Sequence, residues 1–187
     1  MLDEINNVIQ VLSAGGVVLY PTDTIWGIGC DATNSSAVDK IFKIKKRRLS
    51  KSLIILVNNT DMLKEYVMDI PDITWDLIGS FETPTTIIYP EAKNLAQNIA
   101  ASDKSIAIRI AKDEFCQQLI TLFGKPIVST SANISGEPTP LLFGKISEKI
   151  IQSVDYVVKT DHDKIRQLKA STIIKLSENC EFTIVRK

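Results

Sequence analysis

Short apolar runs alternate with amphipathic segments along the chain, and this alternation limits the folds that the sequence can adopt. Apolar runs that read as buried strands occur at 17–20, 53–57, 85–89, 105–110 and 126–130. Apolar residues at helical spacing predict a helix from Asp3 to Gly15-Gly16, one from Ser35 or Ser36, one at 60–68 capped by Thr60, and others at 72–80 and 114–123. The last third predicts a helix at 140–152 and strands at 155–159, 171–176 and 181–186.

This order of elements predicts an α/β domain with a mixed, largely buried sheet. The run LIILV (53–57) is apolar on both faces, which is typical of a central strand. The runs at 85–89 and 105–110 are too close for a long crossover helix, so the topology is not a simple βαβ repeat. No GxGxxG follows the first strand and no GxxxxGK[ST] occurs, which argues against Rossmann and P-loop nucleotide sites.

Length and composition suit one globular domain. The chain has 187 residues and is 44% hydrophobic, so we expect a single domain over 1–187. No apolar stretch approaches the roughly 18–20 residues that cross a bilayer, and the acidic start MLDEINNVIQ has no signal-peptide layout. We therefore expect a soluble cytoplasmic protein without membrane contacts.

Cysteine and histidine usage narrows the chemistry. Cys30, Cys116 and Cys180 are far apart and form no CxxC pair, which argues against a disulfide framework and a structural zinc site. His162 is the only histidine, and it lies in the charged stretch KTDHDK, where we expect it to be solvated. A Ser-His-Asp triad or a His-based metal site would need this residue. We therefore expect an enzyme of this sequence to work without histidine and without a metal held by the protein.

The charges are balanced in number but not in position. The chain has 22 Lys and Arg against 22 Asp and Glu, yet six of its cations lie in KIKKRRLSK (43–51). A basic patch on an otherwise acidic chain suits a specific polyanion better than general nucleic-acid binding, for which the whole domain is usually basic. The alternative is a solvated helix end, where cations complement the helix dipole.

Two polar segments follow predicted strands. PTDTIWGIGCDA (21–32) combines hydroxyls, a carboxylate and an aromatic ring with two glycines that permit close backbone approach. STSANISGEPTP (129–140) supplies further hydroxyls and an amide. Ligands of α/β sheets bind beyond the carboxyl ends of strands, so both segments are candidates for a phosphate or nucleotide site. Local turn chemistry is the alternative for either segment alone.

PTDTIWGIGCDA, KIKKRRLSKSLIILV, SIAIRI and STSANISGEPT, in this order and spacing, resemble the YrdC/Sua5/TsaC family from Gly15 to Arg186. That family makes L-threonylcarbamoyladenylate from L-threonine, bicarbonate or CO₂ and ATP, in the first step of t⁶A modification of tRNA. The resemblance implies a nucleotidyltransferase of the short TsaC/YrdC form, with a twisted sheet and a large basic cavity. It also implies Mg²⁺ bound with ATP, a TsaD-type tRNA transferase with accessory proteins as partners, and weak contact with double-stranded RNA or tRNA.

The resemblance also implies roles for single residues. The catalytic residues, facing the ATP phosphates, are implied to be Lys45 and Arg47. L-threonine is implied to contact Thr24, Arg109, Ser129 and Ser171, with Arg109 on the carboxylate. ATP is implied to contact Arg47, Lys51, Ser105, Ser131, Asn133, Thr139 and Arg186. The commoner family text Lys-Gly-Arg-Pro reads Lys45-Lys46-Arg47-Arg48 here, Ser52 stands where a proline is usual, and Trp26 replaces a tyrosine.

These residue types suit adenylate formation. A carbamate oxygen attacks the α-phosphorus of ATP and expels pyrophosphate, which needs positioning and charge stabilisation more than covalent help. The forks of Arg47 and Arg109 fit phosphate and carboxylate, and Mg²⁺ is held mainly by phosphates and waters. Asp23 is either an outer-sphere ligand of Mg²⁺ or the cap of a turn. No residue is assignable as the general base.

Two other interpretations remain at the level of sequence. The first is a double-stranded-RNA-binding module, against which stand the single basic run and the few aromatic residues. The second is a YciO-like paralogue of the same fold without this activity. The intact Lys45-x-Arg47 and Ser131-x-Asn133 pairs argue against it.

Overall fold

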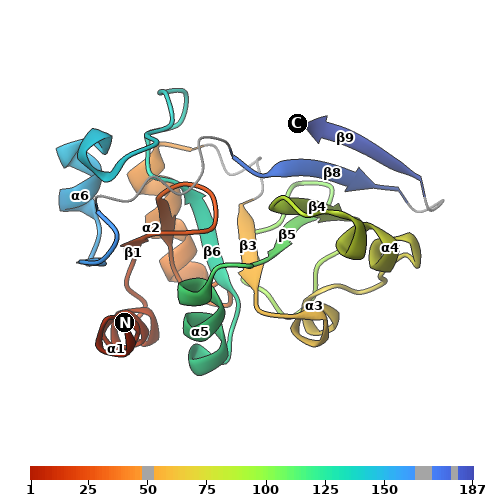
Figure 1. Ribbon diagram of the computed structural model, residues 1–187, viewed down its shortest axis with the longest axis horizontal. Helices are drawn as coiled ribbons and strands as arrows, with labels where there is room; N and C mark the ends of the chain where they lie inside the picture. Colours follow the sequence, from red (N-terminus) through yellow and green to blue (C-terminus); the bar gives the residue numbers. More distant parts are fainter. Residues whose placement is uncertain (48–52, 163–169, 178–180) are drawn as a thin grey trace.

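The computed structural model describes residues 1–47, 53–162, 170–177 and 181–187. Its described strands form one mixed sheet in the order β7-β1-β2-β6-β3-β5-β4-β8-β9 (Figure 1). Three pairs, β1/β7, β3/β5 and β4/β8, are parallel and the others are antiparallel. The strands are β1 Val18–Tyr20, β2 Gly27–Gly29, β3 Ile54–Val57, β4 Thr85–Tyr89, β5 Ile106–Ile110, β6 Ile127–Ser131, β7 Tyr156–Val157, β8 Thr172–Leu176 and β9 Phe182–Arg186. The predicted α/β class with a mixed sheet is confirmed.

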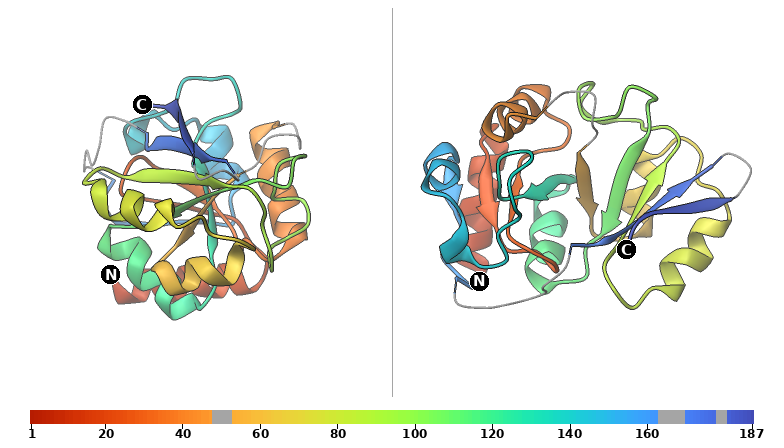
Figure 2. Two further views of the ribbon diagram at one scale, coloured as in Figure 1. Left: turned by 90° about the vertical axis from the view of Figure 1, so that its right-hand side faces the viewer. Right: turned by 90° about the horizontal axis from the view of Figure 1, so that it is seen from above.

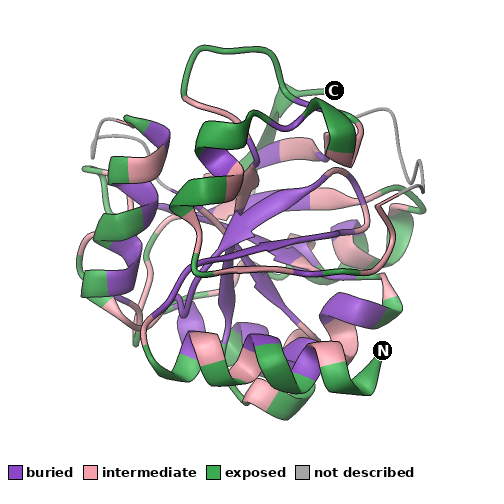
Figure 3. Ribbon diagram, turned by 90° about the vertical axis from the view of Figure 1, so that its left-hand side faces the viewer, coloured by how far each residue is buried: buried purple, intermediate pink, exposed green. Residues whose placement is uncertain are grey.

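Helices cover both faces of this sheet (Figure 2). The helices are α1 Leu2–Ser13, α2 Ser35–Lys45, α3 Thr60–Tyr66, α4 Ile73–Ser80, α5 Glu114–Phe123 and α6 Glu148–Ser153, with a 3₁₀ turn at Phe143–Lys145. On one face, α1 packs against α5 over Leu56 of β3, whereas Ile55 and Val57 of the same strand face α2 and α3. This alternation buries the central strands on both sides (Figure 3), as the all-apolar run 53–57 predicts.

α2 and α3 begin at the predicted residues, whereas the start of α1 and the capping residue of α3 differ from the prediction. α1 begins at Leu2, so Asp3 lies in its first turn rather than at its cap, where its charge still complements the helix dipole. α2 begins at Ser35, as predicted, and the side chain of the preceding Asn34 accepts a hydrogen bond from the Ala37 N–H. In α3 the cap is Asn59 rather than Thr60. In α2 and α3 the asparagine just before the predicted start satisfies the free N–H groups of the first turn.

Two other predictions about elements were wrong. The single helix at 140–152 is absent: the chain makes only a 3₁₀ turn at 143–145 and the short helix α6, with Gly144 between apolar residues that turn toward the core. The segment 21–32 contains a strand, β2, which its two glycines hid. A Cβ at Gly29 would collide with the Val128 carbonyl and the Tyr20 ring, so close packing rather than positive φ requires this glycine.

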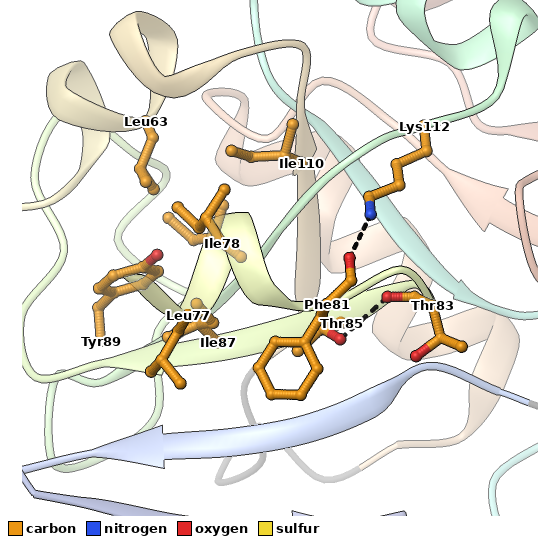
Figure 4. Close-up of a pocket in the computed structure, with 11 residues that line it drawn as sticks. Leu63, Leu77, Ile78, Phe81, Thr83, Thr85, Ile87, Tyr89, Ile110 and Lys112 are labelled. Atoms are coloured by element: carbon orange, nitrogen blue, oxygen red, sulfur yellow. Dashed lines mark hydrogen bonds between the residues drawn. The ribbon is translucent and has the colours of Figure 1, made fainter. Parts of the chain in front are cut away.

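An apolar crevice lies between α4 and the sheet (Figure 4). Leu77 and Ile78 of the helix face Ile87 of β4 and Ile110 of β5 across it. Lys112 closes one side by donating a hydrogen bond from Nζ to the Phe81 carbonyl oxygen at 2.6 Å. The volume of the crevice, about 30 Å³, has room for a water or two, so we interpret it as imperfect packing.

Candidate active site

A cavity of about 580 Å³ lies on the other face of β4 and β5. The loop after β1, the end of α2, strands β3, β4, β5 and β6, and the C-terminal hairpin β8–β9 all contribute to it. Its size is typical of small-molecule sites, which occupy about 300–1,000 Å³. The lining residues are Thr22, Thr24, Ile25, Gly27, Arg47, Leu53, Ile54, Ile88, Ala101, Ala107, Arg109, Ser129, Thr130, Ser131, Thr139, Ala170, Ser171, Ile173, Val185 and Arg186.

Strand register fixes the floor of the cavity. Ile54 pairs with both Ser129 and Ala107, and Ala107 pairs with Ile88, so these four residues form a row across β6, β3, β5 and β4. Side chains two residues apart on a strand share a face, which places Arg109 of β5 on the same face as Ala107. The floor is therefore apolar along one row, with a guanidinium group and a hydroxyl at its edges.

Both polar loops predicted from the sequence reach this cavity. β1 and β6 are each antiparallel to β2, so their carboxyl ends lie at the same edge of the sheet. Gly27 pairs with Ser131, and the Ala132 N–H donates to the Trp26 carbonyl oxygen at 3.2 Å. The expectation that the two segments meet at strand ends is therefore confirmed by their geometry.

Threonine 22 is a lining residue that the sequence analysis did not single out. Its hydroxyl lies 3.0 Å from that of Thr24 and donates to the Ile25 carbonyl oxygen at 2.8 Å. Both threonines are buried. The sequence did hold a signal for Thr22, because the two threonines of PTDT stand two residues apart and either hydroxyl could face a ligand.

Arginine 109 projects from the middle of the sheet and pairs with Asp23. Its Nη2 lies 2.9 Å from Asp23 Oδ1, and the exposed fractions of the two side chains are only 4% and 6%. Burial raises the pKa of Asp23, while the positive charge of Arg109 lowers it. Sequence reasoning left Asp23 between a metal helper and a turn cap; the structure makes it the counter-ion of Arg109.

Arginine 186, on β9, anchors the C-terminal hairpin to the cavity wall. Its Nε and Nη2 donate to the Ser171 carbonyl oxygen at 3.0 and 2.8 Å. The Ser171 hydroxyl lies 2.8 Å from that of Thr86 on β4. Burial, together with the nearby charge of Arg109, lowers the pKa of Arg186, so the two guanidinium groups face the same space.

The end of α2 positions Arg47. Lys46 adopts a left-handed conformation at φ 49°, and the Arg47 N–H donates to the Phe42 carbonyl oxygen at 3.0 Å. This is a Schellman motif, in which the helix ends and the next residue leaves at a fixed angle. Arg47 then lines the cavity, and burial lowers its pKa.

Lysine 45 does not line the cavity. Its ammonium group donates to the Ser131 and Asn133 carbonyl oxygens at 2.5 and 2.6 Å and lies 3.4 Å from Asn133 Oδ1. The Ser131 hydroxyl donates to that same Oδ1 at 2.5 Å. Lys45 therefore fastens α2 to the loop after β6, and burial, with the adjacent charge of Arg47, lowers its pKa to about 8.

The cavity brings together eight of the residues predicted to form the site: Thr24, Arg47, Arg109, Ser129, Ser131, Thr139, Ser171 and Arg186. Lys45 and Asn133 lie behind its wall, in contact with each other. Ser105 is also outside the lining, because its hydroxyl donates to Asp103 at 2.6 Å. Lys51 lies outside the described residues.

Comparison with known proteins identifies the family. The family profile of Sua5, YciO and YrdC, described as "Telomere recombination", matches residues 10–187. The chain belongs to the Sua5/YciO/YrdC family. A member named threonylcarbamoyl-AMP synthase, from Pseudoalteromonas translucida, is 37% identical over 153 residues, which cover 80% of this chain and 82% of the relative.

Solved structures of the Sua5/YciO/YrdC family have the same fold. P. abyssi Sua5 complexed with L-threonine is 29% identical with a TM-score of 0.85, and the match covers 93% of this chain and 51% of Sua5. This chain therefore spans about half the length of that Sua5. E. coli YciO matches with a TM-score of 0.85 over 98% of this chain and 88% of its own length, at 22% identity, which shows the fold alone.

Histidine 162 of this family member is not simply solvated, as the sequence analysis expected. Its ring stacks on Phe143, with ring centroids 3.6 Å apart, and meets the edge of Trp26 at 5.4 Å. Its Nε2 lies 2.7 Å from the Val158 carbonyl oxygen. The charged neighbours in KTDHDK hid these contacts, because both aromatic partners come from distant parts of the chain.

The described residues have neither a metal-binding cluster nor a membrane-spanning helix. They contain no group of three or more His, Cys, Asp or Glu side chains that could hold a metal ion. Within the same ranges, no helix combines the length and apolarity needed to span a membrane.

Proposed function

We propose that this protein is an L-threonylcarbamoyladenylate synthase, which joins L-threonine, bicarbonate or CO₂ and ATP and releases pyrophosphate. The observation that carries the proposal is that three arginines, Arg47, Arg109 and Arg186, line the same cavity as five hydroxyl side chains that were predicted to contact the substrates. The names of the relatives support the same activity, and L-threonine is the ligand of the Sua5 structure. In enzyme class, the proposed reaction makes it a nucleotidyltransferase.

The arrangement suggests how the substrates are divided. Arg109 suits the amino-acid carboxylate, because a guanidinium fork binds a carboxylate through two parallel hydrogen bonds, and the lining residues Thr24 and Ser129 offer hydroxyls for the rest of the amino acid. Arg47 at the end of α2, with Ser131 and Thr139, suits the triphosphate. The carbamate formed on the threonine amine would then lie between the two groups, in line with the α-phosphorus.

The chemical step needs charge stabilisation more than a nucleophile from the protein. As the carbamate oxygen attacks, negative charge spreads over the phosphoryl oxygens and the leaving pyrophosphate. Fixed guanidinium groups in a partly buried cavity stabilise that charge without reorganising. The described lining residues of the cavity include no carboxylate. We propose that Mg²⁺ arrives with the ATP phosphates.

Lys45 has a different proposed role from the one implied by the family resemblance. Its ammonium group is held by the Ser131 and Asn133 carbonyl oxygens, so it does not point at the phosphates. We propose that it fixes the position of Ser131 relative to Arg47. Asn133, which donates from Nδ2 to the Glu137 carbonyl oxygen at 2.7 Å, completes the same loop.

The proposed product is a reactive mixed anhydride that must be passed on. We propose a TsaD-type transferase with its accessory proteins as its acceptor in the cytoplasm, where tRNA is modified. The RNA-binding interpretation has less support, because the cavity gathers its three arginines around one partly buried space instead of spreading them along a groove.

Incubation with ATP, Mg²⁺, bicarbonate and each amino acid in turn tests the proposal, with pyrophosphate release and mass spectrometry of the adenylate as readouts. We expect a product with L-threonine only, and Arg47→Ala should abolish it. Lys43→Ala is the matched control, because Lys43 is an exposed cation on α2 outside the cavity lining.

Three results would contradict the proposal. They are pyrophosphate release independent of threonine, full activity of Arg47→Ala, and a folded wild-type protein without turnover. The last result, with tight and salt-sensitive RNA binding, would favour the RNA-binding module. Without RNA binding it would favour a paralogue with another activity.

A further inference from the structure

The ion pair between Asp23 and Arg109 joins two parts of the site that are distant in sequence. Asp23 belongs to the loop after β1, between the lining residues Thr22 and Thr24, whereas Arg109 stands on β5 in the floor. The pair is almost completely buried, with 2.9 Å between Arg109 Nη2 and Asp23 Oδ1. The carboxylate thus reaches the guanidinium group from beside the cavity, and Asp23 itself is not a lining residue.

Arg109 keeps donors for a second partner. A guanidinium group carries five N–H donors, and the buried Nε of Arg109 has no hydrogen-bond partner among the described residues. An unsatisfied buried donor of this kind is costly unless a ligand or water meets it. Within the described chain, both carboxylate oxygens of Asp23 likewise lack a hydrogen-bond partner, so the contact with Nη2 is an ion pair. Arg109 lines the cavity, and the donors that Asp23 does not meet are left for an anion there.

The charges around the pair show why a carboxylate is needed there. Arg186 faces Arg109 closely enough for the charge of Arg109 to lower its pKa. The other ionisable groups near the pair are Asp113 ahead of α5, Cys116 on α5 and Tyr20 on β1. Cys116 and Tyr20 are buried, and burial raises the pKa of each, so neither supplies a negative charge at neutral pH. Asp113 carries a second carboxylate near the pair, and the ion pair described for Arg109 is the one with Asp23.

We propose that Asp23 is a positioning residue that holds the Arg109 guanidinium against the repulsion of Arg186, with its free edge turned toward the carboxylate of the amino-acid substrate. This inference rests on the proposed function, because it takes an amino acid as the ligand of Arg109. Asp23 acts through Arg109 and does not touch the substrate. Its removal should weaken binding of the amino acid and leave the triphosphate end of the site unchanged.

Steady-state kinetics of Asp23→Asn, which keeps the shape and removes the charge, test the proposal. We expect the KM for L-threonine to rise about tenfold or more, while the KM for ATP and kcat at saturating threonine change by less than about twofold. Asp31→Asn is the matched control: Asp31 is equally buried and pairs with Lys125 at 2.9 Å, away from the cavity. Its threonine KM should equal that of the wild type.

A double-mutant cycle separates positioning from general destabilisation. In an Arg109→Gln background, where there is no guanidinium group to orient, Asp23→Asn should not change the threonine KM further. Thermal unfolding of each variant shows that it is folded, and calorimetric titration with L-threonine replaces kinetics for a variant too slow to assay.

The outcomes distinguish this inference from the proposed function. A threonine KM of Asp23→Asn that is unchanged or lower than that of the wild type overturns the positioning role. The same holds if the effects of Asp23→Asn and Arg109→Gln add, or if kcat alone falls. A wild-type protein that neither turns over nor binds L-threonine overturns the proposed function instead.

Discussion

At the scale of single residues, the least usual feature is a lysine buried in the wall of the site. Lys45 is 2% exposed and directs its ammonium group at carbonyl oxygens rather than at a carboxylate. Burial disfavours the charged form of the amine, and the nearby charge of Arg47 adds to this effect, so the pKa of Lys45 falls to about 8. The KxR pattern alone could not show this, because the acceptors belong to the loop after β6.

The stability of the protein should therefore depend on pH through Lys45. The amine titrates at about 8 in the folded chain and at 10.5 when unperturbed, so between these values the unfolded chain binds more protons. The free energy of unfolding should rise with pH in that window. We expect the stability of the wild type relative to Lys45→Met to increase from pH 8 to pH 10.5 and to be constant below it. Urea unfolding of both proteins across the window measures this; a constant difference throughout would contradict it.

His162 gives a second prediction at this scale. Replacing it with alanine removes the ring stacked on Phe143, and the free energy of unfolding should fall by about 1 kcal/mol. Threonine-dependent turnover should stay near the wild-type level, because His162 is not a lining residue of the cavity. His162→Phe keeps the aromatic contact and should recover most of the lost stability in a thermal melt. A large loss of kcat in His162→Ala would show that the histidine takes part in the reaction.

At the scale of elements, the end of α2 shows how the fold accommodates a departure from the usual family motif. The usual glycine of Lys-Gly-Arg-Pro is Lys46 here, yet the backbone keeps a positive φ of 49°. A side chain in this conformation costs about 1–2 kcal/mol relative to glycine, offset in part by the greater freedom of glycine in the unfolded chain. The Schellman motif that positions Arg47 is thus preserved, although Lys46, unlike glycine, disfavours a positive φ.

Lys46→Gly should therefore stabilise the protein by about 0.5–1 kcal/mol. Lys46 is exposed and outside the cavity lining, so its charge is expendable there. Chemical denaturation measures the gain, and Lys43→Gly is the control, because Lys43 lies within the helix and its replacement should destabilise. Equal losses in the two variants would mean that the strain at Lys46 is not significant.

The elements that the sequence predicted well are those specified by local pattern. The strands at 85–89 and 126–130 and the helix at 114–123, which ends at the left-handed Gly124, lie within a residue or so of their predicted limits. Strand β2 could not be predicted, because one of its two glycines, Gly29, is required by Tyr20 and Val128 across the sheet. The helix predicted at 140–152 fails for a similar reason: Phe143 packs on Trp26 and His162 rather than along a helix.

The same distinction applies to the site. Hydroxyl and guanidinium groups were identifiable from the motifs, and eight of them line one cavity. The partners that orient them were not identifiable. Asp23 meets Arg109, and Lys45 meets Asn133, only because the sheet order brings these segments together.

At the scale of the whole molecule, the middle of the sheet is buried, whereas its β9 edge is exposed to solvent. Strands β3, β5 and β6 are buried in its middle, whereas all five residues of β9 are exposed and β9 pairs with β8 alone. Exposed backbone hydrogen bonds with little packing open at low free-energy cost. The wall of the cavity that includes Val185 and Arg186 is therefore the least stable part of its enclosure.

Hydrogen exchange should reveal this difference and its response to ligands. Amides of β9 should exchange much faster than those of β5, and addition of ATP with L-threonine should slow exchange in β9 because Arg186 and its neighbours gain a partner. The strand β7, at the opposite edge of the sheet and without a lining residue, is the internal control. Equal protection of both edges by the ligands would point to a global effect instead of contact at β9.

The sheet order also has a consequence for biosynthesis. β8 is made late in translation, yet it pairs with β4 and carries β9, so Ser171 and Arg186 join a site whose other parts were synthesised long before. A nascent polypeptide that lacks β8 and β9 lacks the wall of the cavity that these strands supply. Ser171 and Arg186 therefore complete the cavity lining only after β8 has paired with β4 and β9 with β8.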